Sequence, residues 1–399
     1  MITHPSGSAS RARQALWPMV AILLLTLIAP AISTAAKSKK KKDPEVTVMS
    51  RNVYLGADLG PGIDATDTCG AIDAGGVILN QVDRTNFPAR AKLLAAEIDK
   101  ADPDLVGLQE VALWRFDEIS DFSGTPAETV RYDFLQLLLD ELKARGARYK
   151  VAVSQDEFDQ ELPADRDGSD ATNEFLCGAD EDGRLTMRDV ILVKKGGKAK
   201  VSNPEMGQFT TTYDVVLGGV IPISVDRGWV SVDAKVKGDK KTKARKFHFV
   251  NTHLEAFGDP TIREAQAREL FAAGGPLQTK QQLIFLGDIN SGSSKDRIGS
   301  PFPGDPNDPL AYNALVDDFG LFNLGARQSC CYPDPDLSSA AIGGYRFDHT
   351  VDHVMVKPKI KQLDAYITGD DPTVTTPDGL VSSDHGGVVS TLRLKKAKK

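Results

Sequence analysis

The stretch QLIFLGDINSG, residues 282–292, joins a short apolar run to a polar triplet. Residues 283–287 predict a buried β-strand, and Asp288, Ile289 and Asn290 follow where that strand should end in a loop. Because side chains alternate along an extended chain, Asp288 and Asn290 project together and Ile289 points the other way. A carboxylate beside an amide suits a site that activates a water and binds an anionic oxygen. The alternative is an ordinary turn, since Gly, Asp and Asn all favour turns.

Polar side chains also recur near the ends of the other predicted strands. We expect strands at 46–54, 105–109, 149–153, 188–194, 215–223, 228–236, 246–254, 349–356 and 390–394. We expect helices from about 86 to 101, near 132–145, at 262–273 and near 310–318. In chain order, the polar residues at strand exits are Asn52, Glu110, His253, Asp288, Asn290, Asp352, Asp384 and His385.

The mixture of strands and helices predicts the fold class. Short connections in the middle of the chain indicate antiparallel hairpins, and no G-x-G-x-x-G follows a strand. The sequence therefore favours an α/β sandwich of two sheets over a Rossmann fold. The stretches 56–82 and 156–183, which carry Cys69 and Cys177, are interpreted as long rim loops. The apolar tract 215–223 is read as a buried strand, with contact to a lipid surface as the alternative.

The residues at the strand exits indicate metal-assisted phosphate chemistry. Carboxylates such as Glu110 and Asp384 are hard ligands that favour Mg²⁺ or Mn²⁺, and the lack of clustered Cys and His disfavours a structural zinc site. His253 and His385 can exchange protons near neutral pH, and Asp352 could orient one imidazole. Together these groups suit the attack of water on a phosphate ester.

Six motifs in order resemble the endonuclease/exonuclease/phosphatase superfamily, the deoxyribonuclease I-like fold. They are SRNVYLG with Asn52, GLQEV with Gln109 and Glu110, NTHL at 251–254, GDIN at 287–290, TVDHVMV with Asp352, and SDH at 383–385. Each motif is weak alone, and together they span residues 46–394. The resemblance implies a four-layered α/β sandwich of two packed, mixed and largely antiparallel sheets. It also implies a divalent-metal phosphoesterase site at one edge of these sheets.

The resemblance implies a metal side of the site. Glu110 matches the family's metal-binding glutamate, and Asn52 matches an asparagine that helps to place metal and phosphate. Asp384 would lie at or near the metal, which would be Mg²⁺ or Mn²⁺.

The resemblance also implies catalytic roles. Asp288 would orient or deprotonate the water, and Asn290 would hold a phosphoryl oxygen. His253 would bind the phosphate or assist proton transfer, and Asp352 would orient His385.

Some polar residues near these motifs depart from the pattern or lie outside it. The family often has an asparagine in the strand where this chain has Asp189 after Arg188, which adds a charge on the phosphate side. His248 and His353 should face away from the site, because each is an odd number of residues from His253 or Asp352. No role is predicted for His349.

The N-terminus has the order of a secretory signal peptide. Arg11 and Arg13 precede an apolar run and a small-residue zone, so residues 1–36 predict export to the extracellular space or periplasm. An uncleaved membrane anchor is the alternative. Cleavage would change the net charge from −7 to −9, and this acidity argues weakly against non-specific binding to nucleic acid. The lysine-rich arm 37–45 and tail 395–399 are interpreted as solvated, with an anionic surface as the alternative partner.

Four cysteines in an exported chain predict two disulfides. Neighbouring cysteines rarely bond to each other, so Cys330 and Cys331 are each expected to reach a different loop, one bearing Cys69 and the other Cys177.

The sequence as a whole predicts one large domain, 46–394, in a secreted, monomeric, divalent-metal-dependent phosphodiesterase. Its substrate could be nucleic acid or a phospholipid headgroup such as that of sphingomyelin. The alternatives are a phosphatase acting on small phosphate esters and a non-catalytic exported binding protein with the same fold. No stable protein partner is expected.

Overall fold

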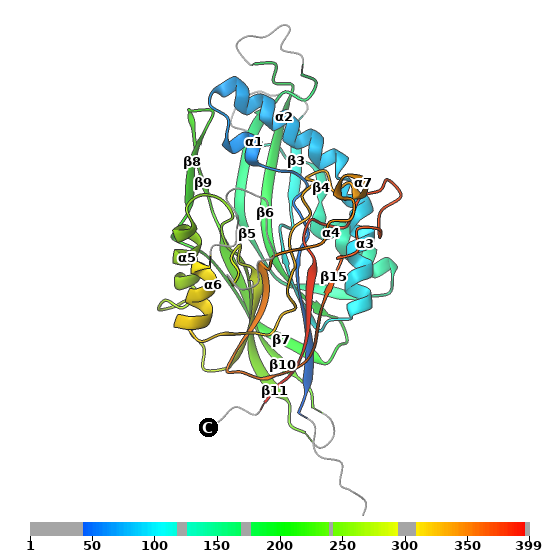
Figure 1. Ribbon diagram of the computed structural model, residues 1–399, viewed down its shortest axis with the longest axis vertical. Helices are drawn as coiled ribbons and strands as arrows, with labels where there is room; N and C mark the ends of the chain where they lie inside the picture. Colours follow the sequence, from blue (N-terminus) through cyan, green and yellow to red (C-terminus); the bar gives the residue numbers. More distant parts are fainter. Residues whose placement is uncertain (1–42, 118–125, 169–176, 239–241, 294–308, 396–399) are drawn as a thin grey trace, which may run out of the picture. The chain divides into compact units, whose positions relative to one another are not determined.

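Two β-sheets pack face to face, with helices on the outer face of each, in the computed structural model of the chain (Figure 1). The structure describes residues 43–117, 126–168, 177–238, 242–293 and 309–395. The predicted signal segment 1–36, most of the basic arm and most of the C-terminal tail lie outside these ranges. The described residues include no helix that is both long and apolar enough to cross a membrane.

The first sheet has eight strands in the order β15-β16-β1-β2-β6-β3-β4, with β5 also paired to β6. β1 and β2 are parallel, and the other pairs are antiparallel. The strands are β1 Glu45–Asn52, β2 Leu105–Gln109, β3 Leu113–Asp117, β4 Thr129–Asp133, β5 Tyr149–Ala164, β6 Glu181–Lys194, β15 Lys361–Thr368 and β16 Gly387–Arg393.

The second sheet has six strands in the order β13-β14-β12-β11-β10-β7. β11 and β12 are parallel, and their neighbours are antiparallel. The strands are β7 Ala199–Gln208, β10 Gly228–Val236, β11 Arg245–His253, β12 Gln282–Asp288, β13 Phe322–Asn323 and β14 Asp352–Lys357. Both sheets are therefore mixed and largely antiparallel, as predicted.

Alternation along the central strands divides the core into layers. Val48 of β1 and Ile284 of β12 lie in the apolar cluster between the sheets, whereas their neighbours Met49 and Phe285 belong to clusters on the outer faces. The outer cluster of the first sheet contains side chains of α2 Thr68–Arg84, α3 Phe87–Ala101 and α4 Phe134–Ala144. That of the second sheet contains side chains of α5 Pro260–Glu269, α6 Leu310–Asn313 and the π-helical turn Ala314–Asp318. The predicted four-layered sandwich is confirmed.

Helix α3 begins and ends where the sequence predicted. The Asn86 side chain accepts a hydrogen bond from Ala89 N, and Pro88 occupies the first turn. The helix ends at Asp102, which has a left-handed conformation. Its buried stripe includes Leu94 and Ile98.

Helix α2 replaces most of the loop that was expected at 56–82, so that prediction is wrong. Asp67 caps the helix by accepting from Gly70 N. A Cβ atom on Gly76 would lie 1.6 Å from the carbonyl oxygen of Asp165. The glycines that suggested a loop instead allow the helix to pack closely against the chain just after β5. Short helices α1 Gly60–Ile63 and α7 Ser339–Ile342 complete the set in the described residues.

The tract 215–223 is a hairpin rather than one strand. β8 Tyr213–Leu217 and β9 Ile221–Val225 pair with each other around Gly218 and Gly219, which have φ values of 56° and 71°. Val216 and Val220 of this hairpin are 52% and 61% exposed. Its apolar side chains are therefore only partly covered by the protein.

The expected disulfide connectivity is wrong. Cys69 is bonded to Cys177, so neither reaches the adjacent pair, and Cys330 is bonded to Cys331. The first bond links the N-terminal end of α2 to the segment that precedes β6. This pairing depends on which loops lie together in space, and the sequence does not reveal that for cysteines 108 residues apart.

Candidate active site

The polar residues predicted at strand exits meet at the carboxyl ends of two parallel strand pairs. Asn52 ends β1 and lies beside Gln109, the residue before Glu110. His253 ends β11 and is paired with Asp288 at the end of β12. Because β14 runs antiparallel to β12, its first residue, Asp352, is paired with Asp288. The sheet registers thus bring these side chains to one edge of the sandwich.

Asn52 connects the two sheets at this edge. Its side-chain nitrogen donates to Glu110 Oε1 at 2.9 Å and to Asp288 Oδ2 at 3.0 Å. Its side-chain oxygen accepts from Tyr54 N at 2.9 Å. Glu110 Oε2 accepts from Leu55 N at 2.8 Å. Asn52 is fully buried, so these bonds hold both carboxylates in fixed orientations.

His385 and Asp352 form a hydrogen-bonded imidazole–carboxylate pair. His385 Nδ1 lies 2.9 Å from Asp352 Oδ2 and 3.6 Å from Asp288 Oδ2. Burial opposes the charged imidazole, but the charges of Asp352, Asp384 and Asp288 raise the pKa of His385 well above its usual value. The imidazole therefore holds a proton on Nε2, the nitrogen that points away from Asp352.

Asp288 lies between the two histidines. Its Oδ1 accepts from Asn290 N at 3.0 Å, and its Oδ2 lies 3.7 Å from His253 Nε2. Burial, reinforced by the charge of Asp352, raises the pKa of Asp288 to about 7. A carboxylate with this pKa can accept a proton from water near neutral pH.

His253 is a neutral imidazole fixed by Arg227. Arg227 Nη1 lies 3.1 Å from His253 Nδ1, and a guanidinium can only donate, so Nδ1 is the acceptor and the ring hydrogen is on Nε2. Burial, together with the charges of Arg227 and His385, holds the pKa of His253 well below its usual range. Nε2 lies 3.1 Å from the side-chain nitrogen of Asn290. That nitrogen donates to Leu254 O at 2.9 Å, and because Nε2 carries its own hydrogen, the contact between Asn290 and Nε2 brings two donors together and is not a hydrogen bond.

Glu110 and Asp384 are acidic groups that face the same cavity. Burial raises the pKa of Asp384, and the charge of Glu110 raises it further despite the opposing effect of His385. A carboxyl whose charge is disfavoured by a neighbouring carboxylate fits a site for a hard divalent cation, because the cation would offset this repulsion. Asn52 lies beside them and holds Glu110 in place.

Two site residues adopt backbone conformations that are uncommon outside glycine. Glu110 has a φ of 57° and Asn290 a φ of 47°. For a glutamate this left-handed conformation costs about 1 kcal/mol or more, and the surrounding structure must hold it. The chain turns at Glu110, directly after β2, and at Asn290, two residues after the end of β12.

The extra acid at position 189 is buried beside a second acid. Asp189 and Glu157 are 1% and 3% exposed, and their carboxyl groups contact each other, while the backbone N–H of Gly228 faces Glu157. Burial raises the pKa of Asp189 well above its usual value and that of Glu157 to about 8, although Arg227 acts in the opposite direction. The pair therefore holds at least one proton at neutral pH, so Asp189 adds less charge than the sequence suggested.

A cavity of about 330 Å³ opens beside the acidic groups, a volume within the usual range of small-molecule sites. Most of its lining is apolar and comes from three places. These are the helices α1 and α2, the strands β5 and β6, and the hairpin β8-β9. Examples of the side chains are Leu79, Phe158, Leu185, Met187, Leu217 and Ile223.

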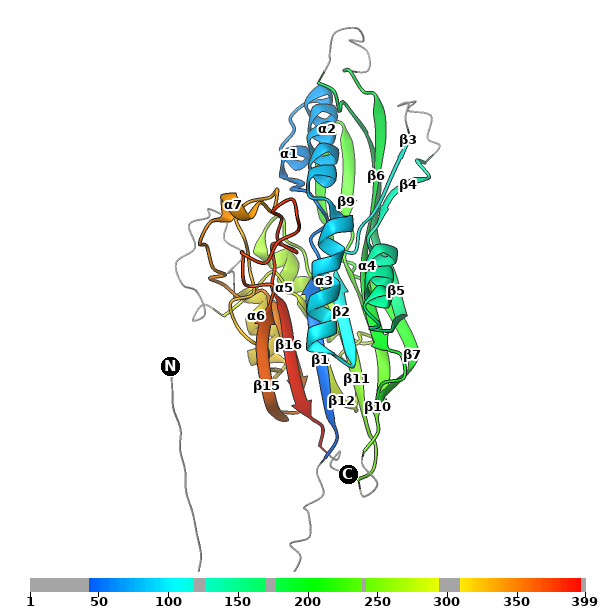
Figure 2. The same ribbon diagram turned by 90° about the vertical axis from the view of Figure 1, so that its right-hand side faces the viewer.

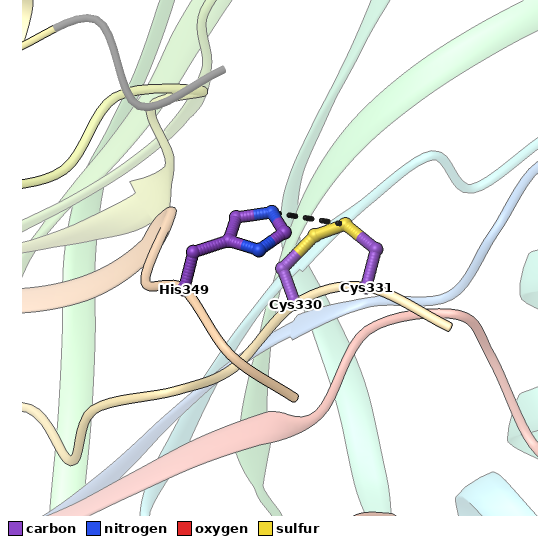
Figure 3. A group of neighbouring side chains, drawn as sticks. All are labelled: Cys330, Cys331 and His349. Atoms are coloured by element: carbon purple, nitrogen blue, oxygen red, sulfur yellow. Dashed lines mark hydrogen bonds between the residues drawn. A yellow bond between two sulfur atoms is a disulfide. The ribbon is translucent and has the colours of Figure 1, made fainter. Parts of the chain in front are cut away.

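Cys330 and Cys331 also lie at the site, and no pattern in the sequence indicated this position. Their Sγ atoms are 3.6 and 3.7 Å from His385 Nε2. Cys331 Sγ is 3.8 Å from His349 Nε2, and Figure 3 shows this imidazole facing the sulfur pair. His349 is therefore close to the site.

Two histidines face away from the site, as the strand period predicted. His248 is bonded through Nδ1 to Asp233 Oδ1 at 3.0 Å. His353 contacts Asn323 and the carbonyl oxygen of Ser291.

Arg227 is the main site residue that the sequence reasoning missed. It is 3% exposed, holds His253, and pairs with the buried Glu255 at 3.3 Å. It precedes β10, which pairs with β11, so only the sheet register brings it next to His253. The sequence did contain a signal. Arg227 comes directly before the strand predicted at 228–236, and His253 lies near the end of the next predicted strand, 246–254. If these two strands pair as a hairpin, the arginine can reach the histidine.

No family model and no curated protein matches this sequence. Similar solved structures include an endonuclease/exonuclease/phosphatase from Bacteroides vulgatus, with 15% identity, a TM-score of 0.47, and coverage of 88% of this chain and 100% of that chain. Another, from Beutenbergia cavernae, has 16% identity, a TM-score of 0.49, and coverage of 88% and 72%. A mannosyl-6-phosphatase from Bacteroides thetaiotaomicron has 16% identity, a TM-score of 0.47, and coverage of 88% and 100%. The superfamily that the motifs resemble therefore recurs among the similar solved structures.

Proposed function

We propose that this protein is a secreted, divalent-metal-dependent phosphodiesterase. The observation that supports it most is the grouping of Asp288, Asp352 and His385, whose ligand atoms all lie within 4.8 Å of one another. In this grouping the pKa of Asp288 and the pKa of His385 are both raised, so that Asp288 can accept a proton and His385 can donate one.

The chain's own residues would divide the reaction between them. Asp288 takes a proton from the attacking water, while His385, held by Asp352, donates its Nε2 proton to an ester oxygen. Asn290 and the Nε2–H of His253 bind phosphoryl oxygens without adding charge.

Glu110 and Asp384, with Asn52 beside them, would hold Mg²⁺ or Mn²⁺. When bound, the cation neutralises the phosphate and stabilises the charge that develops in the transition state.

The substrate class that fits best is a phospholipid whose phosphodiester lies at the acidic groups. The cavity that contains Glu110 and Asp384 is mainly apolar, and such a lining suits a hydrocarbon group next to the phosphate. The hairpin β8-β9 lines the same cavity and exposes Val216 and Val220, which would contact the lipid surface. Nucleic acid fits less well, because the chain is acidic overall.

The first experiment measures hydrolysis of phosphatidylcholine and sphingomyelin vesicles, plasmid DNA, RNA and a soluble bis-aryl phosphodiester, with Mg²⁺ and with a chelator. We expect chelator-sensitive hydrolysis of the soluble diester and of a phospholipid. Hydrolysis of nucleic acid but not of lipid would refute the substrate assignment. No hydrolysis of any diester would refute the enzymatic proposal and favour a binding protein.

Two exposed valines test the lipid contact. Val216→Asp and Val220→Asp should lower hydrolysis on vesicles by roughly tenfold each, since burying one valine contributes about 1.5 kcal/mol. Rates on the soluble diester should not change. Val374→Asp is the matched control, because Val374 is 59% exposed and lies outside the hairpin. Equal losses on both substrates would contradict a lipid-contact role.

Export and a monomeric state are also proposed. The order of charged, apolar and small residues in 1–36 supports cleavage by a signal peptidase. N-terminal sequencing of protein recovered outside the cytoplasm should begin after about residue 36, and a start at Met1 would contradict cleavage. Light scattering of the purified protein should give the mass of one chain.

A further inference from the structure

The cluster of Cys330, Cys331, His349 and His385 brings together two sulfur atoms and two imidazole nitrogens. Cys330 and His349 are joined by an isolated antiparallel bridge, which fixes the two loops relative to each other. His385 Nε2 lies 3.6 and 3.7 Å from the two Sγ atoms, and His349 Nε2 lies 3.8 Å from Cys331 Sγ. The cluster is partly or fully buried.

Both imidazoles are oriented as they are in zinc sites. His349 Nδ1 is bonded to Asp348 Oδ1 at 2.6 Å, and His385 Nδ1 to Asp352 Oδ2 at 2.9 Å. A carboxylate on Nδ1 fixes the ring so that Nε2 faces the ligand position, and it makes that nitrogen a stronger ligand. In both histidines the nitrogen that faces the sulfurs is therefore the one that can bind a metal.

The sulfur–nitrogen separations match those around a tetrahedral thiophilic ion, which the two sulfurs could share only after their bond is broken. Zinc–sulfur bonds of about 2.3 Å and zinc–nitrogen bonds of about 2.1 Å place a sulfur and a nitrogen ligand about 3.6 Å apart in a tetrahedron. The three measured separations lie between 3.6 and 3.8 Å. Two thiolates and two imidazoles select Zn²⁺ over Mg²⁺, which prefers oxygen ligands.

We propose that, after reduction of the Cys330–Cys331 bond, Cys330, Cys331, His349 and His385 form a four-ligand Zn²⁺ site. A dithiol reductant supplies two electrons and two protons to the bond and becomes a cyclic disulfide, which leaves two thiols on the protein. Zn²⁺ then displaces both thiol protons and the proton on His385 Nε2. In the oxidised protein the sulfurs are bonded to each other and cannot act as thiolate ligands.

Zinc at this position would inhibit the hydrolase, and this second part rests on the proposed function. His385 Nε2 would be a metal ligand and would no longer hold a proton for the ester oxygen. The protein would therefore be active when Cys330 and Cys331 are oxidised, and inactive when they are reduced and bound to zinc.

The binding test uses the full mature protein, oxidised or reduced with a dithiol that is then removed. Equilibrium dialysis measures Zn²⁺ bound per chain, and Co²⁺ serves as a probe because thiolate ligands give it an ultraviolet charge-transfer band. We expect the reduced protein to bind one more ion per chain than the oxidised protein, and to be the only form that shows a thiolate band. Ions bound by Glu110 and Asp384 give no such band.

Variants assign the ligands and their support. Cys331→Ser should weaken the thiolate band of Co²⁺, because only Cys330 remains as a thiolate ligand. Asp348→Asn should weaken Zn²⁺ binding about 10- to 100-fold, as loss of a carboxylate behind a histidine ligand usually does. His248→Ala is the matched control, because its imidazole is bonded to Asp233 and should not affect binding. Thermal melting checks that each variant folds. Unchanged Zn²⁺ affinity in folded Asp348→Asn, or no thiolate band in the reduced wild type, would overturn the site.

The activity test separates this inference from the proposed function. Zn²⁺ should inhibit Mg²⁺-dependent hydrolysis by the reduced wild type at least tenfold more strongly than hydrolysis by the oxidised protein or by Cys331→Ser. The claim of inhibition would be wrong if the reduced protein shows thiolate ligation with Co²⁺ but its hydrolysis is not diminished by Zn²⁺. If no diester is hydrolysed at all, the proposed function fails, while the dialysis and spectra still decide the zinc site.

Discussion

Replacing Asp352 by Asn tests how the pKa of His385 is raised. The carboxylate lies 2.9 Å from His385 Nδ1, and a hydrogen bond to a charged group contributes about 1.5–3 kcal/mol. At 1.36 kcal/mol per pKa unit, loss of this charge should lower the pKa of His385 by about 1–2 units. Asp288 stays 3.6 Å from the same nitrogen, so part of the upward shift should remain.

The sign of this change determines the pH dependence. The wild-type imidazolium is stabilised in the folded state, so His385 keeps its proton to a higher pH than an ordinary histidine. In Asp352→Asn the imidazole should lose its proton about 1–2 pH units earlier, and the alkaline limb of the kcat profile should move down by the same amount.

The assay is a histidine NMR titration combined with kcat measured on the soluble diester across pH. Asp233→Asn is the control, because it removes the carboxylate bonded to His248 and should leave the titration of His385 unchanged. If the pKa of His385 in folded Asp352→Asn equals that of the wild type, the account of the imidazole–carboxylate pair is wrong.

Two further predictions concern the scaffold around the site. Arg90 is fully buried and donates to four backbone carbonyls. Arg90→Met should therefore lower the free energy of unfolding, measured by urea denaturation, by at least about 3 kcal/mol. A loss below about 1 kcal/mol would contradict this role. Gly76→Ala should destabilise by about 1–3 kcal/mol or more, because its Cβ would meet the Asp165 backbone. Gly70→Ala is its control, since a Cβ there makes ordinary contacts and the better helix propensity should be neutral or stabilising.

The residues at strand exits could be predicted because their spacing depends only on the local chain. An apolar run followed by Asp288 and Asn290 predicts a strand and the side of the chain on which both residues lie. The parallel registers of β1 with β2 and of β11 with β12 then bring Asn52 toward Glu110 and His253 toward Asp288. The order of the six motifs, through the resemblance to the superfamily, indicated that these pairs belong to one site.

The missed parts of the structure depend on contacts between distant segments. Arg227 reaches His253 through sheet register, and the proton held by Asp189 and Glu157 requires two acids from different strands to be buried together. Helix α2 contains glycines that allow it to approach the chain after β5 closely. Helix propensity depends on the local sequence and does not reveal such a contact. Strands β7 and β15 were not predicted, because both are largely exposed and lack a continuous apolar pattern.

The sulfur pair illustrates the same limit. Adjacent cysteines suggested bonds to distant loops, whereas the structure bonds Cys330 to Cys331 beside His385 and His349. Cys331, His349 and His385 are each separated by many residues in the sequence, so their donor atoms meet only in the folded chain. A search for clustered Cys and His in the sequence could not have found this group.

The most direct test of the central claim measures Mg²⁺-dependent hydrolysis by Glu110→Gln, Asp288→Asn, His385→Ala and the double variant Asp288→Asn/His385→Ala. Each folded single variant should lose at least about a hundredfold in kcat, and the double variant should lose far less than the product of the single losses, because these groups act as one unit. His353→Ala, which lies on the other face of β14, should keep most of the wild-type rate. Near wild-type kcat in folded His385→Ala, or a large loss in His353→Ala, would contradict the proposed site.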